Sequence, residues 1–175
     1  MAMKLAAMRV LIADSNPHMR SLVATVLAAI GVVQFKECSN GEEAYEDLRK
    51  WGPDVAIIAY KMEPCDGLEF TKRVRTAADS PNPFLPIIML TAYASRTLVT
   101  DARDAGVTEF MSKPMTAQAV LDRLNLVIFK PRAFVRSIDY SGPDRRRKTD
   151  AKYAGPWRRE GDAAREDSAA TTAQM

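Results

Sequence analysis

Five short runs typical of β-strands, separated by segments with helical periodicity, most strongly constrain what this chain can fold into. They cover residues 9–13, 34–39, 54–59, 86–91 and 109–111. Strands with few polar residues are typical of sheets buried on both faces, where helices cross over between parallel strands. The pattern therefore predicts an α/β fold with a doubly wound, five-stranded parallel sheet.

The segments between these runs carry helix signals. We expect helices over residues 19–30, 40–51, 67–75, 95–105 and 116–128. Gly31, Gly106 and the Gly52-Pro53 pair end three of them. In a sheet of this kind, binding sites form beyond the carboxyl ends of the strands.

Particular residues stand where the predicted strands end. They are Asp14, Met62, the Asp66-Gly67 pair, the Thr91-Ala92 pair and the Lys113-Pro114 pair. These residues and their spacing resemble CheY-like response-regulator receivers, over residues 9–129. The resemblance implies a flavodoxin-like receiver fold. In that family an aspartate accepts a phosphoryl group from a histidine kinase, an acidic pair binds Mg²⁺, and the Thr and Lys contact the phosphoryl group.

The sequence departs from the family at that site. Ala59 stands where the family has its phosphoacceptor aspartate, and the acidic pair is reduced to Asp14 followed by Ser15. Alanine has no nucleophilic oxygen, and Mg²⁺ commonly needs one or two carboxylates besides phosphate oxygens. Glu63, as a surrogate acceptor, sits four residues too far along the chain. We therefore expect a degenerate phosphorylation site at Ala59, Asp14, Thr91 and Lys113, with no tightly bound Mg²⁺.

The charge distribution separates the receiver-like part from the rest. Residues 1–129 carry 14 Lys and Arg against 15 Asp and Glu, whereas residues 130–175 carry 11 against 7. An anionic partner is therefore expected for the C-terminal tail. Two cysteines make no disulfide framework or metal-ligand spacing, and no apolar stretch is long enough to span a bilayer. These features predict a cytoplasmic protein.

The tail contains one pattern twice. The first copy, residues 136–146, reads RSIDYSGPDRR, and the second copy, residues 147–159, reads RKTDAKYAGPWRR. Both give Arg-x-x-Asp, then Tyr-small-Gly-Pro, one variable residue and Arg-Arg; the second inserts Ala151 and Lys152. A segment that only solvates the chain has no reason to keep these positions in step.

The residue types of each copy suit a guanine nucleotide. Arginine pairs bidentately with phosphate or with guanine O6 and N7. Aspartate accepts hydrogen bonds from guanine N1 and N2, and aromatic rings stack on purines. The Gly-Pro pairs impose turns. Two copies predict a ligand with two such halves, and cyclic di-GMP has two guanines on a twofold-symmetric ring and can self-intercalate into a dimer.

Two resemblances point the same way. Arg-x-x-Asp resembles the motif by which diguanylate cyclases bind cyclic di-GMP at their inhibitory site. A CheY-like receiver followed by an arginine-rich segment resembles the Cle group, CheY-like proteins that bind cyclic di-GMP. That resemblance implies docking on the flagellar motor switch, with control of motility and attachment and recruitment to the motor or cell pole. The resemblance to CheY implies that the partner face is formed by the last helix, the last strand and the preceding helix.

We expect a receiver domain at 1–129, an arginine-rich ligand-binding segment at 130–160 and a disordered tail at 161–175. The residues expected to bind cyclic di-GMP are Arg136, Asp139, Tyr140, Gly142, Pro143, Asp144, Arg145, Arg146, Arg147, Asp150, Tyr153, Gly155, Trp157, Arg158 and Arg159.

Other interpretations of the tail remain open. It could be a localisation or interaction segment of a phosphorylation-type receiver, although Ala59 argues against that. Nucleic acid is disfavoured because Asp139, Asp144 and Asp150 would repel phosphates. Membrane insertion is disfavoured because the Gly-Pro pairs prevent an amphipathic helix. No nucleophile–base pair or complete metal constellation stands out, so we expect no enzymatic activity.

Overall fold

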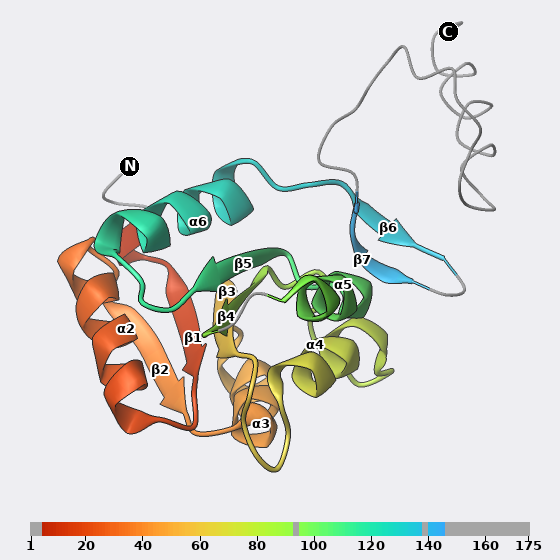
Figure 1. Cartoon of the computed structure of the whole chain (residues 1–175), viewed down its shortest axis with the longest axis horizontal. Coiled ribbons are helices and arrows are strands. Elements are labelled where there is room, and N and C mark those ends of the chain that lie inside the picture. The colour runs from red at the N-terminus through yellow and green to blue at the C-terminus, as the bar shows by residue number, and fades with distance from the viewer. Residues whose placement is uncertain (1–4, 93–94, 138–139, 146–175) are drawn as a thin grey trace, which may run out of the picture. The chain divides into compact units, whose positions relative to one another are not determined.

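The predicted α/β fold is confirmed in the computed structural model, which describes residues 5–92, 95–137 and 140–145 (Figure 1). Its elements are β1 (Arg9–Ala13), α2 (Pro17–Ala29), β2 (Gln34–Cys38), α3 (Gly41–Trp51), β3 (Val55–Ala59), α4 (Gly67–Thr76), β4 (Ile87–Thr91), α5 (Arg96–Ala105), β5 (Glu109–Ser112), α6 (Ala117–Phe129), β6 (Phe134–Arg136) and β7 (Ser141–Pro143). Strands β1 to β5 form a parallel sheet in the order β2-β1-β3-β4-β5.

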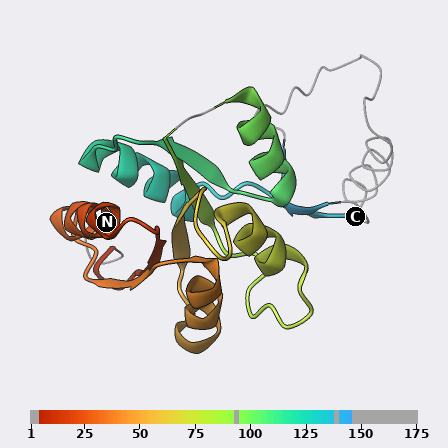
Figure 2. The ribbon, with the colours of Figure 1, turned by 60° about the horizontal axis from the view of Figure 1, so that its bottom comes forward.

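Helices cover both faces of this sheet. Helices α2 and α6 pack on one face, and α3, α4 and α5 lie on the other (Figure 2). Because successive strand residues point to opposite faces, Val10 and Ile12 enter the first layer while Leu11 and Ala13 enter the second. This two-sided burial is the reason that β1, β3 and β4 carry so few polar residues, whereas the edge strand β2 is mostly exposed or half-buried and carries several.

The polar residue at the start of each helix accounts for where the helix begins. The side chains of Asn16, Asn40, Asp66, Ser95 and Thr116 accept hydrogen bonds from backbone N–H groups of the following first turn. A helix leaves its first N–H groups without intrahelical partners, so such caps stabilise its start. Within the described residues, none of the helices is long and apolar enough to cross a membrane.

Gly67 lets α4 start directly against the end of β3. A Cβ atom on this residue would lie 2.4 Å from the carbonyl oxygen of Ala59 and 3.2 Å from a methyl group of Ile58. No side chain fits at that distance. The Asp66-Gly67 pair therefore supplies a helix cap followed by a close backbone approach.

An antiparallel hairpin follows α6 and was not anticipated from the sequence. Strands β6 and β7 pair Phe134 with Pro143 and Arg136 with Ser141. The compact unit that contains the receiver continues to Arg145, beyond the boundary expected at residue 129. The first copy of the repeat thus begins inside this folded unit, while residues 146–175 lie outside the described part of the chain.

The buried side chain of Arg75 connects the residues against which the hairpin packs. Arg75, at 2% exposure, donates to the carbonyl oxygens of Gly106 (3.0 Å), Pro83 (2.7 Å) and Leu85 (2.8 Å). Its guanidinium carbon also lies 5.6 Å from the centre of the Phe134 ring in β6. Burial lowers the pKa of Arg75 to about 10, so the side chain stays charged at neutral pH.

Replacing Arg75 should weaken this edge strongly. Arg75→Met leaves three carbonyl acceptors without their donor, and we expect the free energy of unfolding to fall by about 3 kcal/mol. Lys72→Met, on the exposed side of the same helix, should change it by less than about 0.5 kcal/mol. Urea denaturation of both variants measures the difference, and equal stability of the two would contradict the role assigned to Arg75.

Candidate functional site

The structure brings together the four residues of the expected phosphorylation site at the carboxyl edge of the sheet. Asp14 follows β1, Ala59 ends β3, Thr91 ends β4 and Lys113 follows β5. These strands are neighbours in the sheet, and the Lys113 backbone N–H donates to the Thr91 carbonyl at 2.8 Å. Asp14, Ala59 and Thr91 are all buried, so the residues predicted from spacing share one place.

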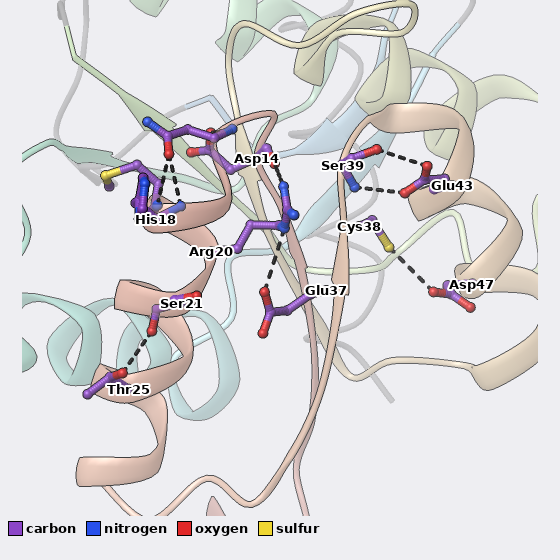
Figure 3. Close-up of polar contacts among 12 residues, drawn as sticks. Asp14, His18, Arg20, Ser21, Thr25, Glu37, Cys38, Ser39, Glu43 and Asp47 are labelled. Atoms are coloured by element: carbon purple, nitrogen blue, oxygen red, sulfur yellow. Dashed lines mark hydrogen bonds and ion pairs between the residues drawn. The ribbon is translucent and has the colours of Figure 1, made fainter.

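Asp14 is the acidic residue that the family pattern retains, and its carboxylate is already engaged. Lys113 Nζ lies 2.5 Å from Asp14 Oδ2, and the backbone N–H of Asn16 donates to Asp14 Oδ1 at 3.0 Å. Arg20 donates to the Asp14 carbonyl oxygen at 2.7 Å and pairs with Glu37 at 3.6 Å (Figure 3). A lysine ammonium therefore neutralises a carboxylate that is 2% exposed.

This arrangement does not fit a magnesium ion. Both Asp14 oxygens have partners, Ser15 supplies no carboxylate, and Ala59 offers only methyl hydrogens where the family has its acceptor. Among the described residues, no group of three or more His, Cys, Asp or Glu side chains comes together as a metal site. Of the four residues at this edge, Asp14 alone carries a carboxylate, and that carboxylate is paired with Lys113.

The described part of the first repeat copy lies against the receiver. Of the residues expected to bind the ligand, Arg136 is exposed, Tyr140, Asp144 and Arg145 are half-buried, and Gly142 and Pro143 are buried. The remaining residues of that set lie outside the described part of the chain: Asp139, Arg146, Arg147, Asp150, Tyr153, Gly155, Trp157, Arg158 and Arg159.

Tyr140 and Arg145 form the centre of the docked copy. The Tyr140 hydroxyl donates to the Pro143 carbonyl at 2.6 Å, and the Arg145 guanidinium lies 3.8 Å from the centre of the Tyr140 ring. Arg145 also pairs with Asp104 of α5 at 3.3 Å. Burial raises the pKa of Tyr140 above its usual value, which Arg145 opposes, so the phenol stays protonated.

The residues on the receiver side of this contact were not predicted from the sequence. Arg132 donates to the Asp144 carbonyl at 2.9 Å and to the Thr108 carbonyl, and it pairs with Glu109 at 3.6 Å. Arg75 lies one helical turn beyond buried Thr71 on the inward face of α4, and that periodicity is the signal that could have marked it. Nothing in the sequence pairs Asp104 with Arg145.

A doubly wound sheet in this strand order, with Asp, Thr and Lys at its carboxyl edge, defines the receiver class of signalling domains. The chain belongs to the response regulator receiver domain family, whose model matches residues 10–125. It is CheY-like in sequence and fold, and the family match ends before the repeated tail.

Two curated relatives and one solved structure illustrate the similarity. The chain is 31% identical over 120 residues to chemotaxis protein CheY-3 of Vibrio cholerae, covering 69% of this chain and 91% of the relative. It is 32% identical over 122 residues to chemotaxis protein CheY1 of Helicobacter pylori, covering 69% and 97%. The structure of Vibrio cholerae chemotaxis protein CheY4 matches with a TM-score of 0.63 and 30% identity. The match covers 70% of this chain and 100% of the CheY4 chain.

Removing the lysine of the closed ion pair should destabilise the receiver. Lys113→Met leaves the Asp14 carboxylate buried without its cation, and we expect the free energy of unfolding to fall by about 2 kcal/mol. Adding Asp14→Asn should recover about half of that loss, since no uncompensated charge remains. Chemical denaturation of the single and double variants measures both changes, with Lys61→Met, at an exposed position, as the control. A Lys113→Met variant as stable as this control would show that the pair is not structural.

Neither cysteine should react in the folded protein. Burial raises the pKa of Cys38 to about 12 and that of Cys65 to about 11. At pH 8 only about one Cys65 thiol in a thousand is then a thiolate, the reactive form. We expect a thiol-specific reagent at pH 8 to label both residues rapidly in urea and neither in the native state. Rapid native labelling would contradict the burial of these thiols.

Proposed function

We propose that this chain is a non-enzymatic, CheY-like signalling effector that binds cyclic di-GMP through its repeated tail. The nucleotide binds as an intercalated pair, and the complex then engages a protein partner. That partner is the flagellar motor switch, through which the effector controls motility and attachment and is recruited to the motor or cell pole.

The duplicated tail pattern is the observation that carries this proposal. Each copy repeats an arginine, an aspartate, an aromatic residue and an Arg-Arg pair in register. Arginine suits the phosphates and the guanine acceptor edge, aspartate suits guanine N1 and N2, and an aromatic ring stacks on the base. Two such sets match a ligand with two guanines and two phosphates.

The contact between Tyr140 and Arg145 supports the stacking part of the proposal. The guanidinium plane lies 3.8 Å from the ring centre, within the range of cation–π contacts. The spacing of the pattern therefore brings its aromatic residue and its first paired arginine together. A guanine base presents a similar flat π surface to either group.

The receiver supports an input other than phosphorylation. Ala59 provides no acceptor oxygen, and Lys113 is held on Asp14 at 2.5 Å. A signalling protein without that input needs another, and a ligand-binding tail supplies one. If the tail were only a localisation segment, the chain would still need a phosphoryl acceptor to act as an ordinary receiver.

The proposed partner surface is the face formed by α5, β5 and α6. It is proposed by analogy with the chemotaxis proteins to which the chain is similar. A tail that orders around its ligand loses conformational entropy on binding, which suits a switch controlled by ligand concentration.

Calorimetric titration of the full chain with cyclic di-GMP tests the proposal, with cyclic di-AMP as the matched nucleotide. We expect guanine-selective binding of about two nucleotides per chain, because an intercalated pair presents two faces to two copies. Equal binding of both nucleotides that falls steeply with salt would instead identify a nonspecific basic patch.

Substitutions in the second copy test which residues bind. Arg147→Ala and Asp150→Ala should each weaken cyclic di-GMP binding by about tenfold or more, since each removes hydrogen bonds that involve a charged group. Arg165→Ala and Asp162→Ala make the same charge changes outside the repeat and should bind like the parent chain. If the repeat variants also bind like the parent, the assignment of the motif is wrong.

A further inference from the structure

In the first repeat copy, side chains that are proposed to bind the ligand instead contact the receiver and each other. Arg145 lies over the Tyr140 ring at 3.8 Å and pairs with Asp104 at 3.3 Å. Its side chain is 18% exposed, so little of the guanidinium is open to a further partner. The same two side chains are the ones expected to stack on a base and to hold a phosphate.

The backbone of the hairpin is fitted closely to the receiver edge. A Cβ on Gly142 would lie 2.8 Å from the Cα of Gly106, and a Cβ on Gly106 would lie 2.7 Å from the Ser141 carbonyl oxygen. The Ser141 hydroxyl donates to the Arg75 carbonyl at 3.2 Å. The hairpin lies beside α4 and the end of α5 (Figures 1 and 2). The Ser-Gly-Pro segment of the first copy is thus a docking element as well as a turn.

One donor of the docked arginine remains unsatisfied. The Nε atom of Arg145 is buried and makes no hydrogen bond within the described part of the chain. Leaving this N–H group buried without an acceptor costs free energy. A phosphate or a guanine edge offers two acceptors side by side, so it could accept from Nε and from a second guanidinium nitrogen together. Arg145 therefore makes fewer hydrogen bonds against the receiver than it would make with a bidentate ligand.

We propose that the receiver edge formed by Arg75, Asp104 and Gly106 is a docking site for the first repeat copy, and that this site competes with the nucleotide. The inference rests on the proposed function. Tyr140 and Arg145 cannot face the receiver and a nucleotide at once, so ligand binding lifts the hairpin. The apparent affinity for the ligand is reduced by the fraction of molecules in which the copy is docked. Release uncovers the edge next to α5, which links ligand binding to the proposed partner face.

The test weakens the dock without touching the repeat. Asp104→Asn removes the charge that pairs with Arg145 at 3.3 Å and with Arg103 at 3.1 Å, and Asp104 is an exposed helix residue, so we expect the fold to be retained. We expect the variant to bind cyclic di-GMP about two- to fivefold more tightly than the parent, the range of an exposed ion pair. Asp101→Asn removes the same charge from an exposed position of α5 and controls for nonspecific attraction of an anion.

A second readout follows the receiver side of the dock. Without nucleotide, the backbone amide resonances of Gly106 and Val107 in Asp104→Asn should shift from their parent positions in the direction that cyclic di-GMP moves them in the parent.

The outcomes separate the two proposals. Tighter binding by Asp104→Asn than by Asp101→Asn, with the matching resonance shifts, supports the competing dock. If the parent binds cyclic di-GMP but Asp104→Asn binds equally or more weakly than Asp101→Asn, the dock does not compete, and the proposed function stands alone. If the parent itself binds no cyclic di-GMP, the proposed function fails and the competing dock fails with it.

Discussion

The buried guanidinium of Arg75 makes hydrogen bonds to two separate segments of the receiver. It donates hydrogen bonds to the carbonyl oxygens of Pro83 and Leu85 in the loop before β4 and to that of Gly106 in the turn after α5. Phe134 of the hairpin lies against the same group. A charged side chain is costly to bury unless its donors are satisfied, and here backbone carbonyls satisfy them. The position of the hairpin depends on this edge, since its glycine contact is made at Gly106.

The two ends of the sheet make different contacts. At the carboxyl ends of the strands, Lys113 pairs with Asp14, and Ala59 has no side-chain oxygen. At the opposite, amino ends of β4 and β5, the chain beyond α6 folds back through Arg132, which bonds to Thr108 and pairs with Glu109. The described contacts of the tail therefore lie at the opposite end of the sheet from Asp14 and Lys113.

Local signals account for what could be predicted of the fold and the site. Apolar strands, capping residues such as Asn40 and Asp66, and terminating glycines each act within a few residues, so the elements were placed to within about two residues. The degenerate pocket was predictable because parallel strands end at one edge, which puts Asp14 and Lys113 together. The exposure of single residues was less predictable: Leu22 is apolar yet 42% exposed, because its neighbours Val23 and Leu27 take the inward face of α2.

The amino-acid sequence by itself determined the receiver fold, the loss of the phosphoacceptor and the duplication in the tail. Each is a matter of residue identity and spacing. Only the tertiary structure decided that the first copy is docked and already uses its tyrosine and arginine. That contact joins Gly142 to Gly106 and Arg145 to Asp104, residues far apart in the chain. No local pattern encodes such a pairing, because it exists only once the sheet and its helices have brought α4, α5 and the hairpin to one edge.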